Sequence, residues 1–452
     1  MINEILSGTQ KYIAENNKTE RKGKGQFFTP LVIAEFMAQK AAVSNEHLSI
    51  LEPGAGNGLL TANLIKYLIE HNMCQSFSIE FVENDPGILP VLSHTGELIR
   101  EYVKEAGGSA EIKICTENYI TDEKKREYDI VICNPPYRKI RKDSEESICM
   151  SPYVYGQPNL YGLFMCKALD DLKENGRFVF ITPRSWTSGN YFKKVRHHIL
   201  RNINLTDLLL FENRKNVFTD EDVLQETLIT CGTKGLKQDK MICFYDESFE
   251  PFYVPSKTVK GISSDEYLLL PSRKTDIETI NKMSGLKDTF ESMGYCFKTG
   301  PVVEFRNRSS LSRTEKKGYV PMFRTANIVG GKFVFPAHVD KAQYVDAGEK
   351  KLLLSNMNTV LVRRLSAKEE DRRLQSCVYR RRQAEYISIE NHVNYLVRTD
   401  GTPLTEGEAE WINALLMSDD YDNYYRMING NTQVNASEIN KLPVKKENKC
   451  YL

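Results

Sequence analysis

Short apolar runs alternate with amphipathic stretches along the first half of the chain. Runs of strand length lie at 49–52, 77–83, 111–114, 128–133 and 177–182, with two more at 205–211 and 226–232. Between them, apolar residues recur every three to four positions at 59–70, 88–106 and 160–173. This alternation predicts an α/β fold, a doubly wound Rossmann-like sheet with helices on both faces.

The pattern changes near residue 240. The segment 231–240 is polar, contains glycine and has no periodicity. Beyond it lie irregular strand candidates at 323–335 and one predicted helix at 408–428. Since 452 residues exceed a typical domain, we expect a catalytic core at 1–240 and a second region at 241–452.

Composition places the chain among ordinary globular proteins, with 41% hydrophobic and 27% charged residues. It contains no uninterrupted apolar run of the roughly 18 residues that a membrane span needs, and no secretory leader pattern. Ten cysteines without a C-x-x-C pair argue against a zinc site or a disulfide framework. We therefore expect a cytoplasmic protein without a metal.

A glycine-rich turn, LEPGAGNG, follows the first predicted strand and precedes the first predicted helix. Gly54, Gly56 and Gly58 would let a ligand approach the backbone and the helix N-terminus. Glu83 follows 25 residues after Gly58, at the end of the second strand, where a carboxylate can accept hydrogen bonds from ribose hydroxyls. Together these residues indicate a cofactor that contains adenosine.

The tetrapeptide NPPY follows the apolar run IVIC, and its members are Asn134, Pro135, Pro136 and Tyr137. The two prolines fix an extended backbone and remove two N–H donors, so a carbonyl beside them is offered as an acceptor. The Asn134 side-chain oxygen and the Pro135 carbonyl could bind the two hydrogens of an aromatic amine such as adenine N6. Tyr137 could stack on a base extruded from the duplex.

Positive charge is concentrated in two places. Residues 301–400 carry 19 Lys and Arg against 11 Asp and Glu, an excess of 8. Arginines suit phosphate contacts and the reading of guanine, although each one singly can be a solvated surface charge. The candidates for DNA binding are Arg363, Arg364, Arg372 and Arg373, together with Arg138, Lys139 and Arg141 directly after NPPY.

These motifs resemble those of the gamma-type adenine-N6 DNA methyltransferases of type II restriction–modification systems, such as the TaqI-type enzymes. FFTP (27–30) is similar to their N-terminal motif, LEPGAGNG to the cofactor loop, VENDP (82–86) to the ribose motif and NPPY to the catalytic motif. The motifs also stand in the gamma order. Segments at 361–373, 387–398 and 429–444 look like the DNA-recognising region of the PstI and BsuBI-type methyltransferases.

The resemblance implies a role for each matching residue. Thr29 and Glu52 would hold the methionine part of S-adenosyl-L-methionine, Pro53 would belong to the cofactor loop and Glu83 would bind the ribose. Phe164 would contact the cofactor adenine, and Phe218 would stack on the extruded base. After the third strand the family has an acidic residue and then an aromatic, whereas this chain has Glu117, Asn118 and Tyr119. Either Asn118 or Glu117 would contact the cofactor adenine.

The sequence therefore predicts an adenine-specific DNA methyltransferase with a C-terminal target-recognition domain. Its partner would be double-stranded DNA, and a cognate restriction endonuclease would be its functional counterpart. Two alternative hypotheses remain: a methyltransferase that acts on RNA or on a protein glutamine, and an inactive DNA-binding subunit. No separate nuclease domain is recognisable.

Overall fold

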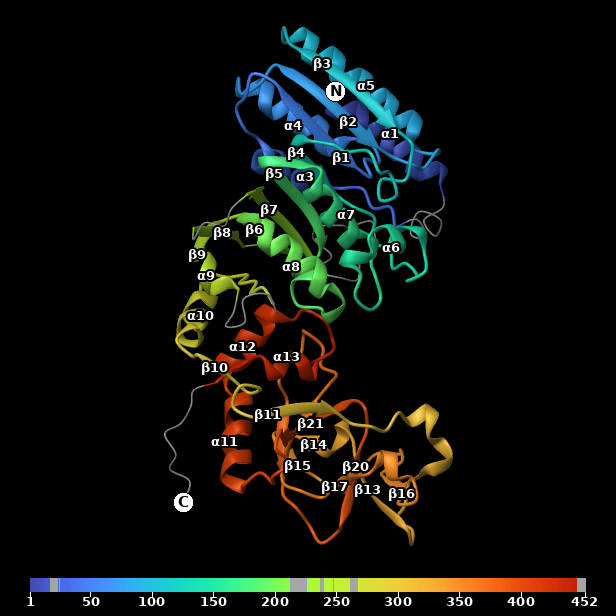
Figure 1. Cartoon of the computed structure of the whole chain (residues 1–452), viewed down its shortest axis with the longest axis vertical. Coiled ribbons are helices and arrows are strands. Elements are labelled where there is room, and N and C mark those ends of the chain that lie inside the picture. Colours follow the sequence, from blue (N-terminus) through green and yellow to red (C-terminus); the bar gives the residue numbers. More distant parts are fainter. Residues whose placement is uncertain are drawn as a thin grey trace. The chain divides into compact units, whose positions relative to one another are not determined.

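The computed structural model describes residues 1–16, 23, 25–211, 226–235, 240–246, 248–260 and 267–444. The chain divides into two compact units, which are coloured by sequence in Figure 1. The first comprises Met1–Val259 with Leu270–Lys274, and the second comprises Lys260–Leu269 with Thr275–Leu452. Among the described residues, no helix combines the length and the apolar character needed to cross a membrane.

The first unit is built on a nine-stranded sheet in the order β3-β2-β1-β4-β5-β7-β6-β8-β9. Its strands are β1 (Leu48–Pro53), β2 (Ser76–Val82), β3 (Ser109–Cys115), β4 (Tyr128–Cys133), β5 (Leu172–Pro183), β6 (Ile203–Phe211), β7 (Thr227–Lys234), β8 (Met241–Tyr245) and β9 (Pro251–Pro255). Its helices are α1 (Ile2–Glu15), α3 (Leu31–Ala41), α4 (Leu59–Glu70), α5 (Leu89–Glu105), α6 (Glu145–Cys149), α7 (Leu160–Asp170), α8 (Lys193–Asn202) and α9 (Ser256–Val259).

The five strands β3-β2-β1-β4-β5 are parallel to one another, and β7 runs antiparallel between β5 and β6. Strand β4 shows why this sheet forms. Ile130 and Ile132 join the core cluster that α1, α3, α4 and α5 also line, whereas Val131 and Cys133 are buried outside that cluster. Because successive side chains point to opposite faces, a strand buried on both faces is apolar throughout. The predicted doubly wound α/β fold is confirmed.

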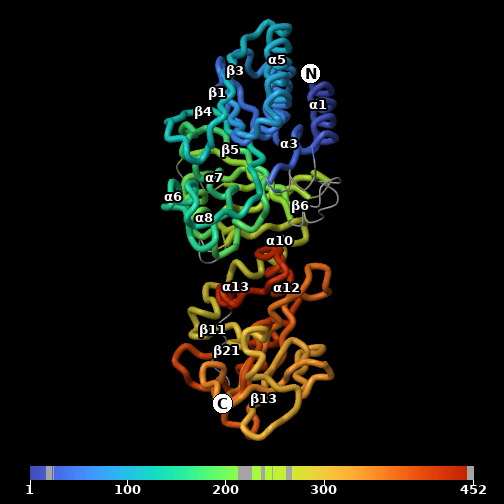
Figure 2. The backbone as a smooth tube through the Cα atoms, turned by 90° about the vertical axis from the view of Figure 1, so that its right-hand side faces the viewer, coloured from blue at the N-terminus to red at the C-terminus, as the bar shows by residue number. Residues whose placement is uncertain are grey.

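Helices cover the sheet in two groups. Helix α1, at the N-terminus, contacts α4 and α5 and runs beside α5 in Figure 2, while α3 packs on α4. Helices α7 and α8 contact each other, and α7 also contacts β5 while α8 contacts β6. The apolar periodicity predicted α4, α5 and α7 to within three residues at each end, but the first two helices of the chain were not predicted.

The first unit extends past the expected boundary at residue 240. Strand β8 pairs in parallel with β6, and β9 pairs with β8, so both complete the same sheet. The polar segment near 240 is therefore a connection within the first unit, and the unit continues to Val259.

The second unit consists of small sheets and short helices. A four-stranded sheet has the order β11-β21-β18-β19 and a five-stranded one the order β12-β16-β13-β20-β17. The strands are β10 (Asp288–Thr289), β11 (Tyr295–Thr299), β12 (Leu311–Ser312), β13 (Tyr319–Phe323), β14 (Ile328–Val329), β15 (Lys332–Phe333), β16 (Tyr344–Asp346), β17 (Leu354–Ser355), β18 (Thr359–Arg363), β19 (Ser376–Tyr379), β20 (Tyr386–Ile389), β21 (Val393–Arg398) and β22 (Pro443–Val444). The helices are α10 (Asp276–Ser284), α11 (Glu406–Leu416), α12 (Asp419–Ile428) and α13 (Ala436–Asn440).

The single helix predicted at 408–428 is two helices. Helix α11 ends at Leu416, and the Ser418 side chain accepts a hydrogen bond from the Tyr421 backbone N–H as the N-cap of α12. A serine followed by acidic residues is a helix start signal, and here it interrupts the apolar pattern.

Arg373 is part of the interior of the second unit. Its side chain is 1% exposed and donates hydrogen bonds to Ser366 Oγ and to the carbonyls of Asn429 and Asn431. A guanidinium held in this way has no surface to offer to a phosphate. The prediction that Arg373 binds DNA is therefore wrong, because sequence shows its charge but not its burial.

Replacing Arg373 should destabilise the protein. Arg373→Met leaves two backbone carbonyls and a serine hydroxyl without their donor, and such losses cost about 3 kcal/mol or more. We expect the thermal midpoint to fall by roughly 6 °C or more. Differential scanning fluorimetry measures it, with the exposed Arg381 changed to Met as the matched control. Equal midpoints for the two variants would contradict the structural role.

Candidate active site

The predicted site residues meet at the carboxyl ends of β1, β2 and β4. The chain runs from β1 toward β2 and β3 on one side, and from β4 toward β5 on the other, so a crevice opens between β1 and β4. A cavity of about 420 Å³ lies there. Gly54, Glu83 and Asn134, each directly following one of these strands, contribute to its lining.

The glycine loop has the conformation that its sequence predicts. Gly54, Gly56 and Gly58 have φ angles of 66°, 55° and 72°, where residues with a Cβ are strained. Gly54 and Gly56 line the cavity, whereas Gly58 does not. A Cβ at Gly58 would lie 3.0 Å from side-chain carbons of Leu92 and Thr95, so this glycine lets α4 and α5 pack closely.

Pro53 also does not line the cavity. Its carbonyl accepts a hydrogen bond of 3.0 Å from the Cys133 thiol, which joins the ends of β1 and β4. Pro53 and Gly58 therefore shape the cavity without forming its surface, which the loop lines with Glu52 and residues 54–57.

Two buried carboxylates face the cavity. The two oxygens of Glu83 accept hydrogen bonds from the N–H groups of Gly56 (2.9 Å) and Asp85 (2.8 Å), which fixes the carboxylate next to the glycine loop. Glu52, 2% exposed, accepts a hydrogen bond of 3.0 Å from the Thr61 N–H. Burial raises the pKa of Glu83 and raises the pKa of Glu52 to about 8. A cationic or hydroxyl-bearing ligand would therefore stabilise the ionised form of both side chains.

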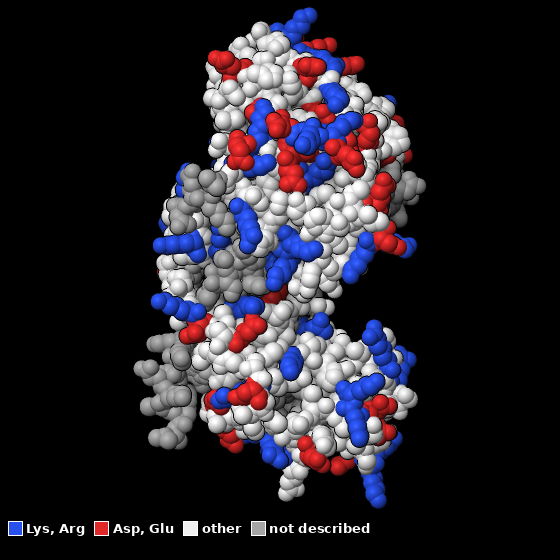
Figure 3. All heavy atoms as spheres, viewed as in Figure 1, with Lys and Arg blue, Asp and Glu red and all other residues white. Residues whose placement is uncertain are grey.

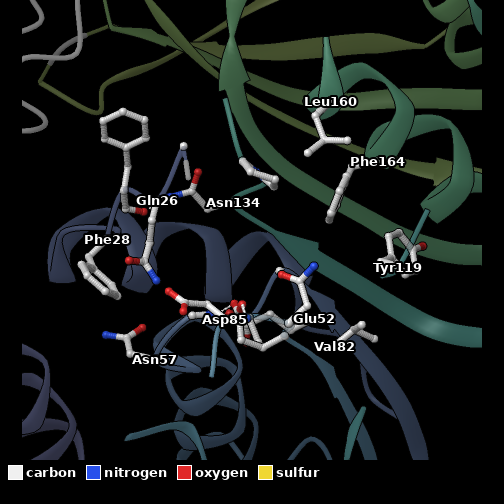
Figure 4. Close-up of a pocket in the computed structure, with 18 of the residues that line it drawn as sticks. Gln26, Phe28, Glu52, Asn57, Val82, Asp85, Tyr119, Asn134, Leu160 and Phe164 are labelled. Carbon is white, nitrogen blue, oxygen red and sulfur yellow. Dashed lines mark hydrogen bonds between the residues drawn. The ribbon is translucent and has the colours of Figure 1, made fainter. Parts of the chain in front are cut away.

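The cavity has a polar side and an apolar side (Figure 4). The polar side presents Glu52, Asn57, Asp85 and Gln26 with the Phe28 ring beside them, and the apolar side presents Leu160, Phe164 and Tyr119. The Phe164 and Tyr119 rings lie 5.2 Å apart between centroids, and the Tyr119 hydroxyl donates to Asp171 at 2.8 Å. An amphipathic ligand with one flat ring system fits this division.

The N-terminal helix contributes contacts that the sequence did not predict. The Tyr12 hydroxyl lies 3.2 Å from both Gln26 Oε1 and Asp85 Oδ2, and Thr9 Oγ1 accepts a hydrogen bond of 2.8 Å from Asn57. Gln26 directly precedes FFTP and Asp85 lies within VENDP, so the two motifs already singled out were the available signal. Helix α1 therefore holds three residues of the polar side of the cavity in place through hydrogen bonds.

The side chains at 117 and 118 both line the cavity. Asn118 Oδ1 accepts a hydrogen bond of 3.1 Å from the Ile120 N–H, and its amide nitrogen donates to Glu146 at 3.3 Å. Glu117 is exposed and pairs with Lys124 at 3.5 Å. Either residue remains a candidate for contacting the cofactor adenine.

The amide of Asn134 is held in one orientation. Its nitrogen donates hydrogen bonds to the Phe27 carbonyl at 2.9 Å and to Thr29 Oγ1 at 3.0 Å. Both amide hydrogens are thereby used, and the oxygen is left as an acceptor. The FFTP segment thus orients the predicted catalytic amide, while Thr29 also lines the cavity.

The rest of NPPY is fixed by its neighbours. Pro135 is buried, and Pro136 lines the cavity. The Tyr137 hydroxyl donates to the Ile181 carbonyl at 3.1 Å, and its ring stacks on Phe27 with centroids 5.6 Å apart. Phe218, the other residue predicted to stack on a base, lies outside the described residues.

The basic residues predicted to bind DNA divide by unit. Arg138, Lys139 and Arg141 follow NPPY and are all exposed, although Arg141 pairs with Asp143 at 2.6 Å. Arg138 additionally lines the cavity. In the second unit, Arg363 pairs with Glu370, Arg364 donates to the Asn391 carbonyl and Arg372 pairs with Asp419 at 2.7 Å. The arginines after NPPY therefore have more surface available for a phosphate.

The doubly wound sheet, the glycine loop and the divided cavity define the first unit as the catalytic fold of an S-adenosylmethionine-dependent methyltransferase. A family model described as Eco57I restriction-modification methylase matches residues 76–218. The type II methyltransferase M.BsuBI of Bacillus subtilis is 31% identical over 445 residues, which cover 94% of this chain and 87% of the relative. M.PstI of Providencia stuartii is 30% identical over 446 residues, which cover 94% of this chain and 88% of that relative.

The chain therefore belongs to the family of type II methyltransferases that contains M.BsuBI and M.PstI. The predicted family is confirmed. Among solved structures, the type IIG restriction endonuclease BpuSI superposes with a TM-score of 0.49 at 13% identity, covering 93% of this chain and 59% of that one.

The raised pKa of Glu52 predicts a pH-dependent stability. A carboxyl whose pKa is about 8 in the folded protein, against an ordinary 4.5, binds its proton more tightly when folded. Its contribution to stability is therefore complete below about pH 4.5 and is lost as the pH rises through 8. Glu52→Gln keeps an acceptor oxygen but cannot ionise.

The thermal midpoint of the protein without ligand should decrease as the pH rises from 5.5 to 9. The thermal midpoint of Glu52→Gln should decrease less over the same range. Scanning calorimetry across this range measures the difference, and the exposed Glu46→Gln serves as the control that parallels the wild type. If Glu52→Gln also parallels the wild type, Glu52 is ionised in the folded protein and the assignment fails.

Proposed function

We propose that this protein transfers a methyl group from S-adenosyl-L-methionine to the N6 amine of adenine within a short double-stranded DNA sequence. In a restriction–modification system this modification would protect host DNA from a cognate restriction endonuclease. The observation that carries the proposal is the Asn134 amide, whose oxygen is freed as an acceptor at the edge of the cavity.

The cavity residues suit the cofactor. S-adenosyl-L-methionine supplies an electrophilic methyl group on a sulfonium. Glu83, held by two N–H groups, would bind the ribose hydroxyls, and Phe164 would contact the adenine ring. Glu52 and Thr29 would hold the methionine part, where the positive charge of the ligand favours the ionised form of Glu52.

Adenine N6 is a weak nucleophile because its lone pair is delocalised into the ring. The Asn134 oxygen and the Pro135 carbonyl would accept the two N6 hydrogens and favour a tetrahedral nitrogen with its lone pair directed at the methyl group. On transfer, the N–C bond would form as the S–C bond breaks, the electron pair of the S–C bond would stay on the sulfur as a neutral thioether, and one N6 proton would pass to water. Tyr137 would stack on the extruded base and extend its existing stack with Phe27.

DNA binding would begin next to the catalytic motif. Arg138 and Lys139 are exposed directly after NPPY, where phosphates flanking the extruded nucleotide must lie. Arg141 would join them, although its pairing with Asp143 would first be exchanged. The second unit would recognise the target sequence, with Arg363, Arg364 and Arg372 as candidates once their internal partners are released.

The decisive experiment offers several acceptors at once. Purified protein is incubated with radiolabelled S-adenosylmethionine and unmethylated bacterial genomic DNA, bacterial RNA or protein. We expect label only in DNA, as N6-methyladenine, and methylation-sensitive sequencing should place it in one short motif. Label in RNA or protein alone would overturn the proposed substrate, and cofactor binding without any label would favour an inactive subunit.

Replacing Asn134 separates chemistry from cofactor binding. Asn134→Ala removes an acceptor needed in the transition state, so we expect kcat to fall about 100-fold or more, as for loss of one preorganised hydrogen bond. Calorimetric titration should show nearly unchanged affinity for S-adenosylmethionine. Asn281→Ala, an exposed amide on α10, is the control. An active Asn134→Ala enzyme would contradict the role assigned to NPPY.

A further inference from the structure

A chain of aromatic contacts leads away from the catalytic tyrosine. The Tyr137 ring meets the Tyr161 ring edge-on at 6.2 Å, and Tyr161 stacks on Phe192 at 5.1 Å. Phe192 ends a short 3-10 helix, Asn190–Phe192, in the segment between β5 and α8. Two ring-to-ring steps therefore separate NPPY from this segment.

The residue before Phe192 is an exposed aromatic. Tyr191 is 57% exposed, and its ring lies on the backbone of Gly156. A Cβ at position 156 would lie 2.2 Å from Tyr191 Cδ1, and the φ angle of Gly156 is +71°. Only glycine is compatible with this arrangement, so the ring position is defined although much of the ring is open to solvent. Tyr155, directly before Gly156, is 45% exposed. We call Tyr155, Gly156 and Tyr191 the aromatic shelf.

The aromatic shelf adjoins the basic loop after NPPY. Backbone hydrogen bonds join Ile140 N–H to the Pro158 carbonyl at 3.1 Å and Leu160 N–H to the Arg138 carbonyl at 2.8 Å. These two bonds tie the segment that carries Gly156 to the loop that carries Arg138 and Lys139. The loop and the shelf form one continuous part of the surface.

Positive charge surrounds the shelf. Lys139 and Lys142 are exposed on one side, and Lys193 and Lys194 follow Tyr191 at the start of α8. Among the described residues around these segments, the acidic side chains are Asp143, which pairs with Arg141, Glu145, which is exposed, Glu146, which accepts from Asn118, and Asp170, which accepts from the Tyr153 hydroxyl at 3.0 Å. Figure 3 shows mainly Lys and Arg around α8 on the visible face. Cations flanking exposed aromatic rings match a polyanion with stacked bases.

We propose that the aromatic shelf binds duplex DNA next to the target adenine, with the Tyr191 ring stacking on a nucleotide that base extrusion leaves without its neighbour. This inference rests on the proposed function. Extrusion removes one base from the stack and exposes the faces of the adjoining bases. A ring held on Gly156 offers a replacement partner at little cost in side-chain ordering.

The test compares two tyrosines of equal exposure in the same unit. Tyr191→Ala should weaken binding of unmethylated duplex DNA and raise the KM for DNA by about fivefold or more, which is the effect of losing one base–aromatic stack. The KM for S-adenosylmethionine should not change. Tyr253, on β9, is 58% exposed, and Tyr253→Ala should behave as the wild type.

Three further variants distinguish stacking from charge and from misfolding. Tyr191→Phe keeps the ring and should retain DNA affinity, whereas Gly156→Ala displaces the ring and should resemble Tyr191→Ala. Tyr191→Ala should leave the slope of log K against log salt unchanged, whereas Lys139→Gln should reduce it by about one. Thermal midpoints verify that each variant folds.

The outcomes separate this inference from the proposed function. If the wild type methylates DNA and Tyr191→Ala matches Tyr253→Ala in DNA affinity and KM, the aromatic shelf is not a DNA contact. If Tyr191→Phe loses affinity as Tyr191→Ala does, stacking is the wrong explanation. If the wild type methylates no DNA, both the proposed function and this inference fall.

Discussion

The orientation of one side-chain amide organises the catalytic half of the molecule. Asn134 follows β4, yet its nitrogen is bound by the Phe27 carbonyl and Thr29 Oγ1, more than 100 residues earlier in the chain. An amide rotated by 180° would present donors where the proposed methyl transfer needs an acceptor. The two hydrogen bonds fix the side-chain oxygen as the free acceptor, and they require residues 27–29 to lie across the end of β4.

Other contacts keep that arrangement rigid. The Cys133 thiol donates to the Pro53 carbonyl, and the Tyr137 hydroxyl donates to the Ile181 carbonyl. These bonds connect β4 to β1 and to β5 at the edge where the cavity opens. On the other side of the crevice, Glu83 is bound by two N–H groups of the loops that follow β1 and β2. Acceptor groups are thus fixed before a ligand arrives, which is the condition for electrostatic catalysis.

What the sequence could predict was set by local signals. Periodicity located α4, β4 and most of the sheet, and the motifs NPPY and LEPGAGNG located the cavity, because each feature depends on residues close together in the chain. Long-range contacts were not accessible in this way. Nothing near Tyr12 in the sequence indicates that it lies beside Asp85, 73 residues later, and nothing near Gly58 indicates that it faces α5.

The sequence also could not show which positive charges are free to bind DNA. The excess of Lys and Arg at 301–400 suggested a DNA-binding surface, but Arg363, Arg364, Arg372 and Arg373 all form bonds within the second unit. A count of charges does not separate cations that stabilise a fold from cations that face solvent. The basic loop after NPPY is different, because Arg138, Lys139 and Arg141 are exposed and Arg138 lines the cavity. Under the proposed function, phosphate binding would therefore depend most on the first unit, and sequence recognition on residues of the second unit whose internal partners can be exchanged for bases.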